Sequence, residues 1–160
     1  MPEGDTLFRT AASLRPALTG RTIVAARSNS REVDVSSLVH AKISSVEARG
    51  KHLLIHLADG GAIHSHLGMT GSWHLYPVDA VWQKPDKQAA VVLETDERHV
   101  AVCFSPKTLE LLTVAALRRH RWLSQLGPDI LDTPGESWTM DEVTARIRQR
   151  DAAPLGVVLL

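Results

Sequence analysis

The chain has 160 residues, 44% of them hydrophobic, which is enough to form one folded domain or one domain and part of another. Its 18 basic and 18 acidic residues give a net charge of +0, which disfavours a protein that binds nucleic acid through a strongly basic surface. No apolar run approaches the ~18 residues of a membrane span, and Cys103, the only cysteine, excludes an internal disulfide and a cysteine-based zinc site within these residues.

The start of the chain, Met1 to Thr6, has the features of a catalytic amine. If Met1 is removed, the secondary amine of Pro2 becomes terminal and can condense with an aldehyde to give an iminium, a strong electron sink. An α-amino group has a pKa near ~8, so a useful fraction is neutral at physiological pH. Glu3 follows as a candidate proton donor and acceptor. The alternative is an ordinary disordered chain start.

An amphipathic helix is predicted directly after this start, which favours the catalytic interpretation because no flexible spacer separates the two. Its apolar residues recur at steps of four, three and four; they are Leu7, Ala11, Leu14 and Leu18. Asp5 or Thr6 begins the helix and Gly20 ends it. Pro16 is expected to kink or tighten the last turn, because its ring removes an amide and crowds the carbonyl four residues back.

After Gly20 the apolar period changes to two, which predicts strands at 22–26, 42–48, 89–95, 100–104 and 109–114. Residues 49–57 and 62–67 are predicted to pair as a hairpin across the turn Asp59-Gly60-Gly61. The segment 67–73, with two glycines around an apolar residue, breaks the returning strand. Many short strands after one helix predict an α+β fold that is mainly β: an N-terminal helix with an antiparallel β-sandwich or barrel.

The pattern changes again near Leu126-Gly127-Pro128. A helix is predicted at 140–150 with Thr139 as its cap, and residues 154–160 look like the opening of another apolar helix. The chain stops inside that second helix with no polar end, so we expect a truncation there. The expected domains are therefore 1–124, a β-sandwich, and 125–160, a linker with an incomplete helical module.

Two clusters of side chains have competing interpretations. His64 and His66 share one strand face, and His52 and His56 share a face of the partner strand, so the four rings are candidates for a metal site. No acidic ligand lies nearby in the sequence, however, and we predict hydrogen-bonded or solvent-facing histidines without a metal. The basic run 118–121 is suited to phosphate contacts, but a solvated surface is the alternative.

Five segments together closely resemble the formamidopyrimidine-DNA glycosylase and endonuclease VIII family of bifunctional base-excision repair enzymes. They are PEG at 2–4, RGKHLL at 49–54, SHLGMTG at 65–71, LGPD at 126–129 and PLG at 154–156. They stand in the family's order and at similar spacing over nearly the whole chain. The Gly-Asp-Thr continuation at 4–6 is most similar to the actinobacterial endonuclease VIII-like branch.

The resemblance implies a mechanism. Pro2 attacks the anomeric carbon of a damaged nucleotide, the base departs, and the strand is cut by elimination from the iminium. The resemblance assigns to Glu3 the protonation of the sugar ring oxygen as the ring opens and the shuttling of protons. It assigns to Lys51 contacts with the phosphates at the lesion and assistance to base departure. The alternative for Lys51 is an exposed lysine at a strand edge.

The resemblance also implies residues that bind DNA. By the resemblance, Met69 fills the gap that is left in the duplex when the damaged nucleotide is flipped out. The alternative is that Met69 packs in the hydrophobic core. His66 and Arg118 are the other expected DNA contacts.

The chain departs from the family in two respects that bear on the substrate. Oxidised-purine enzymes of the family carry an Arg and a Phe on a later loop, and the region 104–108 here has no such motif. Many members have a carboxylate near position 6, where this chain has Thr6. Oxidised pyrimidines are therefore the expected substrates.

Further expectations concern partners and the longer protein. The helix-two-turns-helix module and zinc finger of the family would lie beyond Leu160, so no cofactor is expected in this chain. We expect a monomer in the cytoplasm, associated with the nucleoid, that acts on damaged DNA. The alternative is a non-catalytic module that binds DNA or another protein.

Overall fold

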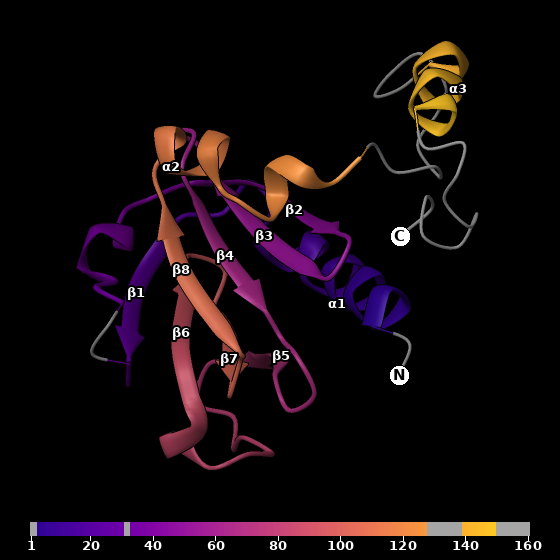
Figure 1. Cartoon of the computed structure of the whole chain (residues 1–160). Helices are drawn as coiled ribbons and strands as arrows, with labels where there is room; N and C mark the ends of the chain where they lie inside the picture. Colours follow the sequence, from indigo (N-terminus) through magenta and orange to yellow (C-terminus); the bar gives the residue numbers. More distant parts are fainter. Residues whose placement is uncertain (1–2, 31–32, 128–138, 150–160) are drawn as a thin grey trace. The chain divides into compact units, whose positions relative to one another are not determined.

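A computed structural model describes residues 3–30, 33–127 and 139–149 (Figure 1). The chain divides into two compact units, Met1–Gln125 and Leu126–Leu160. Pro2, the side chain of Glu3 and the predicted apolar helix at 154–160 lie outside the described structure. Among the described residues, no helix is both long and apolar enough to cross a membrane.

Helix α1, Glu3–Leu18, forms where the apolar stripe predicts it and begins two residues earlier than expected. The four residues of the stripe, Leu7, Ala11, Leu14 and Leu18, are all buried. Pro16 lies in the last turn, and the helix nevertheless continues to Leu18. Gly20 follows with φ +81°, a left-handed conformation that glycine adopts readily and that ends helices.

Eight antiparallel strands form two four-stranded sheets, so the predicted β-sandwich is confirmed. The first sheet has the order β1 (Ile23–Ser28), β6 (Ala89–Thr95), β7 (His99–Phe104), β5 (Ser72–Pro77). The second sheet has the order β2 (Ile43–Arg49), β3 (His52–Leu57), β4 (Ala62–His66), β8 (Thr108–Leu112). Single turns of 3-10 helix, at Ser36–Leu38, Asp86–Gln88 and Leu123–Gln125, occur in the connections.

Strand β5 and helix α2 (Val114–Arg119) were not predicted from the sequence. Strand β5 lies at the edge of its sheet, where Pro77 is tolerated because its missing amide interrupts no interior ladder. The strand predicted to reach Val114 ends at Leu112, and α2 begins instead. The side chain of Thr113 accepts a hydrogen bond from the Ala116 amide at 3.2 Å, which caps α2 and stops the strand.

In the second unit, helix α3 spans Met140–Arg148 and confirms the prediction of a helix capped by Thr139. The Thr139 hydroxyl accepts from the Glu142 amide at 3.3 Å, and the Glu142 carboxylate accepts from the Thr139 amide at 3.0 Å. This reciprocal pair is a capping box, which satisfies two backbone donors that the helix itself leaves open.

Helix α1 packs mainly against β2 and also contacts β3, β5 and β7. Because β2 and β5 are edge strands of their respective sheets, α1 closes one side of the sandwich. Its buried stripe joins the core that fills the space between the two sheets. The helix start is therefore held by the same core as the strands.

One buried hydrogen bond links the two sheets. The Trp73 indole N–H, on β5, donates to the Ser65 hydroxyl, on β4, at 2.9 Å. Trp73 is 8% exposed and Ser65 is fully buried, so water cannot replace either partner. Indole nitrogen is only a donor, and Ser65 is therefore the acceptor.

We predict that Ser65→Ala lowers the free energy of unfolding by about 1–3 kcal/mol, because it leaves a buried indole N–H without an acceptor. The double variant Ser65→Ala/Trp73→Phe should lose less than the sum of the two single losses, since no unpaired donor then remains. Urea unfolding measures each value. The matched control is Ser13→Ala on the exposed face of α1, which should change stability by less than about 0.5 kcal/mol; additive losses in the double variant would contradict the assignment.

Candidate functional site

The segments that carry Lys51, His66 and Met69 meet at one end of the second sheet. Lys51 lies in the turn between β2 and β3, and Met69 lies in the loop between β4 and β5. The strand register pairs Leu53 with Ser65, so the beginning of β3 and the end of β4 are neighbours. His66, the last residue of β4, stands between the two connections.

The start of α1 lies at this same end. The Gly20 amide donates to the Ile43 carbonyl at 2.8 Å, and the Arg15 side chain donates to the Val46 carbonyl at 3.1 Å, so the helix runs back along β2. From Arg15 to Glu3 the helix covers ~18 Å, and from Val46 to Lys51 an extended chain covers ~17 Å. The backbone of Glu3 is therefore about level with Lys51. Figure 1 shows the beginning of α1 and the β4–β5 loop on the same side of the first unit.

Met69 is 75% exposed at the tip of a tight, glycine-bounded turn. The Gly71 amide donates to the Leu67 carbonyl at 3.0 Å. A Cβ on Gly71 would lie 2.4 Å from the Leu67 carbonyl oxygen, so the turn admits no larger residue there. Gly68 has φ +63°, which also suits glycine. The alternative that Met69 fills the core is wrong, because the turn presents its side chain to solvent.

Lys51 is exposed, and its turn includes Gly50 with φ +59°. His66 is half-buried, and its Nδ1 has no hydrogen-bond partner among the described residues. The His66 ring lies 5.3 Å from that of His52, centroid to centroid. These side chains are thus presented from the ends of strands, which hold them more firmly than a long loop would.

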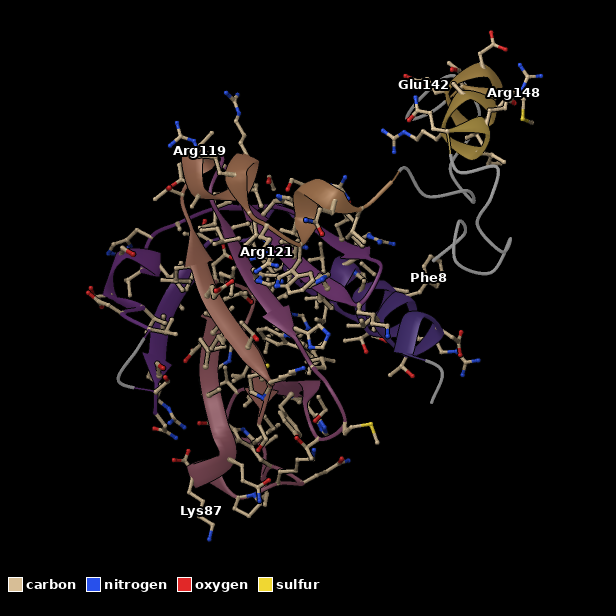
Figure 2. All side chains as sticks on the ribbon, viewed as in Figure 1. Phe8, Lys87, Arg119, Arg121, Glu142 and Arg148 are labelled. Carbon is tan, nitrogen blue, oxygen red and sulfur yellow. The ribbon has the colours of Figure 1, made fainter. Side chains whose placement is uncertain are left out.

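Arg118 is not brought to this end of the sheet. It is exposed on α2, which begins beside the β3–β4 turn: a Cβ on Gly60 would lie 2.9 Å from a Val114 methyl group. That turn is at the far end of β3 and β4 from Lys51. Figure 2 shows the neighbouring residue, Arg119, pointing away from the sheets.

A hollow of about 320 Å³ lies between residues 5–14 of α1 and strand β5. Asp5, Thr6 and Arg9 are part of its lining on the helix, and Trp73 and Leu75 are part of its lining on the strand. Asp5 and Arg9 form an ion pair at 3.2 Å on its rim. A carboxylate is therefore present here one residue before Thr6. This hollow could not be predicted from the sequence without strand β5, which forms one of its walls.

The histidines are arranged differently from the sequence prediction, which found no acidic partner for them. Glu110, 46 positions from His64 in sequence, pairs directly with it across β4 and β8, and its Oε2 lies 2.9 Å from His64 Nδ1. The same oxygen lies 3.1 Å from Nε2 of His120, which follows α2. His52 Nδ1 lies 2.8 Å from His64 Nε2, whereas His56 pairs separately with Glu47.

These distances define the proton positions. An ionised Glu110 only accepts, so His64 Nδ1 and His120 Nε2 each carry a proton. His64 Nε2 then accepts from His52 Nδ1, and His120 Nδ1 accepts from the Leu123 amide at 3.3 Å. The chain of hydrogen bonds is complete with neutral rings and one carboxylate.

The surroundings of His52 and His64 disfavour positive charge on these two rings and lower the pKa of each. Burial, and then the neighbouring His64, His66 and His120, lower the pKa of His52 from 6.5 to about 4. Burial also lowers the pKa of His64. Burial opposes ionisation of Glu110, but the hydrogen bonds from His64 and His120 outweigh it and lower the pKa of that carboxyl.

Residues 1–112 match the family model for the formamidopyrimidine-DNA glycosylase N-terminal domain. The chain is 34% identical to a probable endonuclease 8 2 of Streptomyces coelicolor, over 100% of this chain and 56% of the relative. It is also 34% identical to the DNA-(apurinic or apyrimidinic site) lyase Nei2 of Mycolicibacterium smegmatis, over 100% of this chain and 59% of the relative. The chain thus spans a little over half the length of these relatives.

Solved structures show the same fold. One is a Lactococcus lactis formamidopyrimidine-DNA glycosylase bound non-covalently to DNA with an abasic site; its TM-score is 0.67 at 17% identity, over 90% of this chain and 56% of that one. Another is the wild-type Lactococcus lactis enzyme with DNA that contains an oxidised pyrimidine; its TM-score is 0.66 at 19% identity, over 80% of this chain and 50% of that one.

We predict that acidification destabilises the fold through His52. The unfolded chain takes up this proton near pH 6.5 and the folded chain only near pH 4, so His52 has no effect above that window and destabilises the fold as pH falls through it. Thermal unfolding between pH 7 and pH 4 tests this. His52→Asn, which keeps a donor near the position of Nδ1 but cannot titrate, should flatten the decline.

His40→Asn is the matched control, because it removes an exposed histidine outside the cluster at a position whose φ of 73° asparagine also adopts. Its melting temperature should decline with pH as in the unmodified chain. An unchanged decline in His52→Asn would assign the acid sensitivity to other groups.

Proposed function

The chain belongs to the formamidopyrimidine-DNA glycosylase family, and we propose that it supplies the catalytic β-sandwich of a bifunctional DNA glycosylase and abasic-site lyase. One observation carries the proposal: the backbone at Glu3, the Lys51 turn and the Met69 loop come to the same end of one sandwich. The helix start, the Lys51 turn and the Met69 loop are thereby available to a single DNA site.

In the proposed reaction, the Pro2 nitrogen attacks C1′ of the damaged nucleotide and the bond from C1′ to the base breaks. Glu3 protonates the sugar ring oxygen as the ring opens, which gives an iminium between Pro2 and C1′. The iminium withdraws electrons, so a proton leaves C2′ and the 3′ phosphate departs. Water then hydrolyses the imine and regenerates the amine.

The remaining residues are proposed to hold the DNA. Lys51, exposed at its turn, binds the phosphates at the lesion. The exposed Met69 enters the space that the flipped nucleotide leaves and offsets part of the lost stacking. His66, at the end of β4, is proposed to contact the DNA at this end of the site. Arg118, on the exposed α2, contacts a phosphate farther from the lesion.

We propose oxidised pyrimidines as the preferred substrates. In oxidised-purine enzymes of the family, an Arg and a Phe lie in the region that corresponds to 104–108 here, and this chain lacks that motif. Only three residues, 105–107, connect β7 to β8 in this region. A connection of this length supports the proposal because it offers no extended loop to fill the space beside the partner base.

The central test is covalent trapping. The chain with Met1 removed, incubated with a duplex that contains an abasic site and with borohydride, should give a stable adduct whose peptide map places the bond on Pro2. The matched control is the chain that retains Met1, because the Pro2 nitrogen is then an amide. Intact mass establishes which form is present. An adduct on Lys51, or equal trapping by the Met1-retaining chain, would overturn the assignment.

We further predict that Met69→Ala slows the excision of a damaged base at least several-fold more than the cleavage of a pre-formed abasic site. Only the first reaction must extrude a stacked base, at a cost of roughly a few kcal/mol. Single-turnover rates on the two substrates measure the difference. A melting temperature close to that of the unmodified chain is expected because the side chain is 75% exposed. Equal slowing on both substrates would contradict the wedge role.

A further inference from the structure

A group of metal-ligand side chains lies on the face of the second sheet that points away from the core. Leu53, Ile55 and Ile63 belong to the core between the sheets. Side chains alternate along a strand, so His52 and His64 project from the opposite face. Glu110 pairs with His64 and projects with it. The proposed glycosylase reaction uses none of these three side chains.

Three donor atoms converge in this group. His64, Glu110 and His120 each offer one ligand atom, and these three atoms lie within 4.8 Å of one another. Glu110 Oε2 is 2.9 Å from His64 Nδ1 and 3.1 Å from His120 Nε2. Ligands of a tetrahedral zinc ion, at bond lengths of about 2.0–2.2 Å, are about 3.4 Å apart. Small side-chain movements therefore suffice to admit an ion.

We propose that His64, Glu110 and His120 form a binding site for a zinc ion. Two imidazole nitrogens and one carboxylate are a donor set that zinc accepts in proteins, with the fourth position left to water. His64 is 2% exposed, whereas the Glu110 side chain is 41% exposed and leaves the site open to solvent. His64 and Glu110 are fixed on adjacent strands, which orients them before an ion arrives.

His52 would orient the proposed ligand His64. Histidines that bind metals usually hold their second ring nitrogen in a hydrogen bond, and His64 Nε2 already has His52 Nδ1 at 2.8 Å. When His64 Nδ1 binds the ion, its proton moves to Nε2 and His52 Nδ1 becomes the acceptor. This contact survives with its direction reversed.

His120 limits the affinity. In the metal-free chain its Nδ1 accepts from the Leu123 amide at 3.3 Å, the longest bond of the network. Binding an ion at Nε2 moves the ring proton to Nδ1, and this contact is lost. The site should therefore bind zinc in the micromolar range, more weakly than closed structural sites with four protein ligands.

Isothermal titration of the tag-free, metal-stripped full chain with zinc tests the proposal. One equivalent should bind, and Glu110→Gln and His120→Ala should each weaken binding at least 10-fold, since each removes one of three ligands. The matched control is His56→Ala, which breaks the other histidine–glutamate contact on this sheet, His56–Glu47 at 2.8 Å, and should bind zinc normally. Circular dichroism establishes that each variant is folded.

Cobalt absorption gives a second readout that needs no variant. Cobalt in a four-coordinate site gives intense visible bands that zinc abolishes by displacement, whereas six-coordinate aqueous cobalt gives weak ones. No saturable binding, the spectrum of aqueous cobalt alone, or full zinc affinity in both ligand variants would overturn the site and leave the neutral hydrogen-bonded network as the role of the cluster. Since neither measurement involves DNA, the result is independent of the proposed glycosylase activity.

Discussion

The burial of one stripe of α1 against the open side of the sandwich is the contact on which the site depends. Its three leucines, if fully buried, would each contribute roughly 1.5–3 kcal/mol, so the helix cannot detach without a large loss of stability. Because α1 runs back along β2, this packing places the helix start at the level of the β2–β3 turn. A chain terminus is ordinarily one of the least ordered parts of a protein, and here it is followed at once by a helix in the core.

The crossing from one sheet to the other is the second constraint. The chain leaves β4 in one sheet and enters β5 in the other within five residues, 67–71, and the Trp73–Ser65 hydrogen bond ties the two strands just beyond the crossing. Gly71 allows the backbone to pass itself closely at this point. The tight turn leaves Met69 exposed, as the proposed insertion into the DNA requires.

The outer face of the second sheet carries a hydrogen-bonded cluster of histidines with one glutamate. His64 is almost fully buried there beside the partly exposed Glu110, and a polar group that loses contact with water requires another hydrogen-bond partner. The chain from His52 through His64 to Glu110 supplies those partners, and His120 reaches the same carboxylate from beyond α2. The segment after α2 is thereby fastened to the sheet. One network thus supplies hydrogen-bond partners to His64 and Glu110 and brings three metal-ligand atoms together.

The sequence by itself determined the elements whose signal is local: helix α1 with its stripe, the β3–β4 hairpin, strand β6 and the capped helix α3. It also indicated the candidate amine chemistry, because the roles of Pro2 and Glu3 were assigned from their positions directly after Met1. Strand β5 was not predicted because its proline is compatible with a strand only at the edge of a sheet. Helix α2 was not predicted because it begins at the Thr113 cap. Only the tertiary structure decided the sheet order, the meeting of α1 with the Lys51 turn, and the pairing of His64 with Glu110. Residues 46 positions apart have no shared periodicity, and only the packing of whole strands brings them into contact.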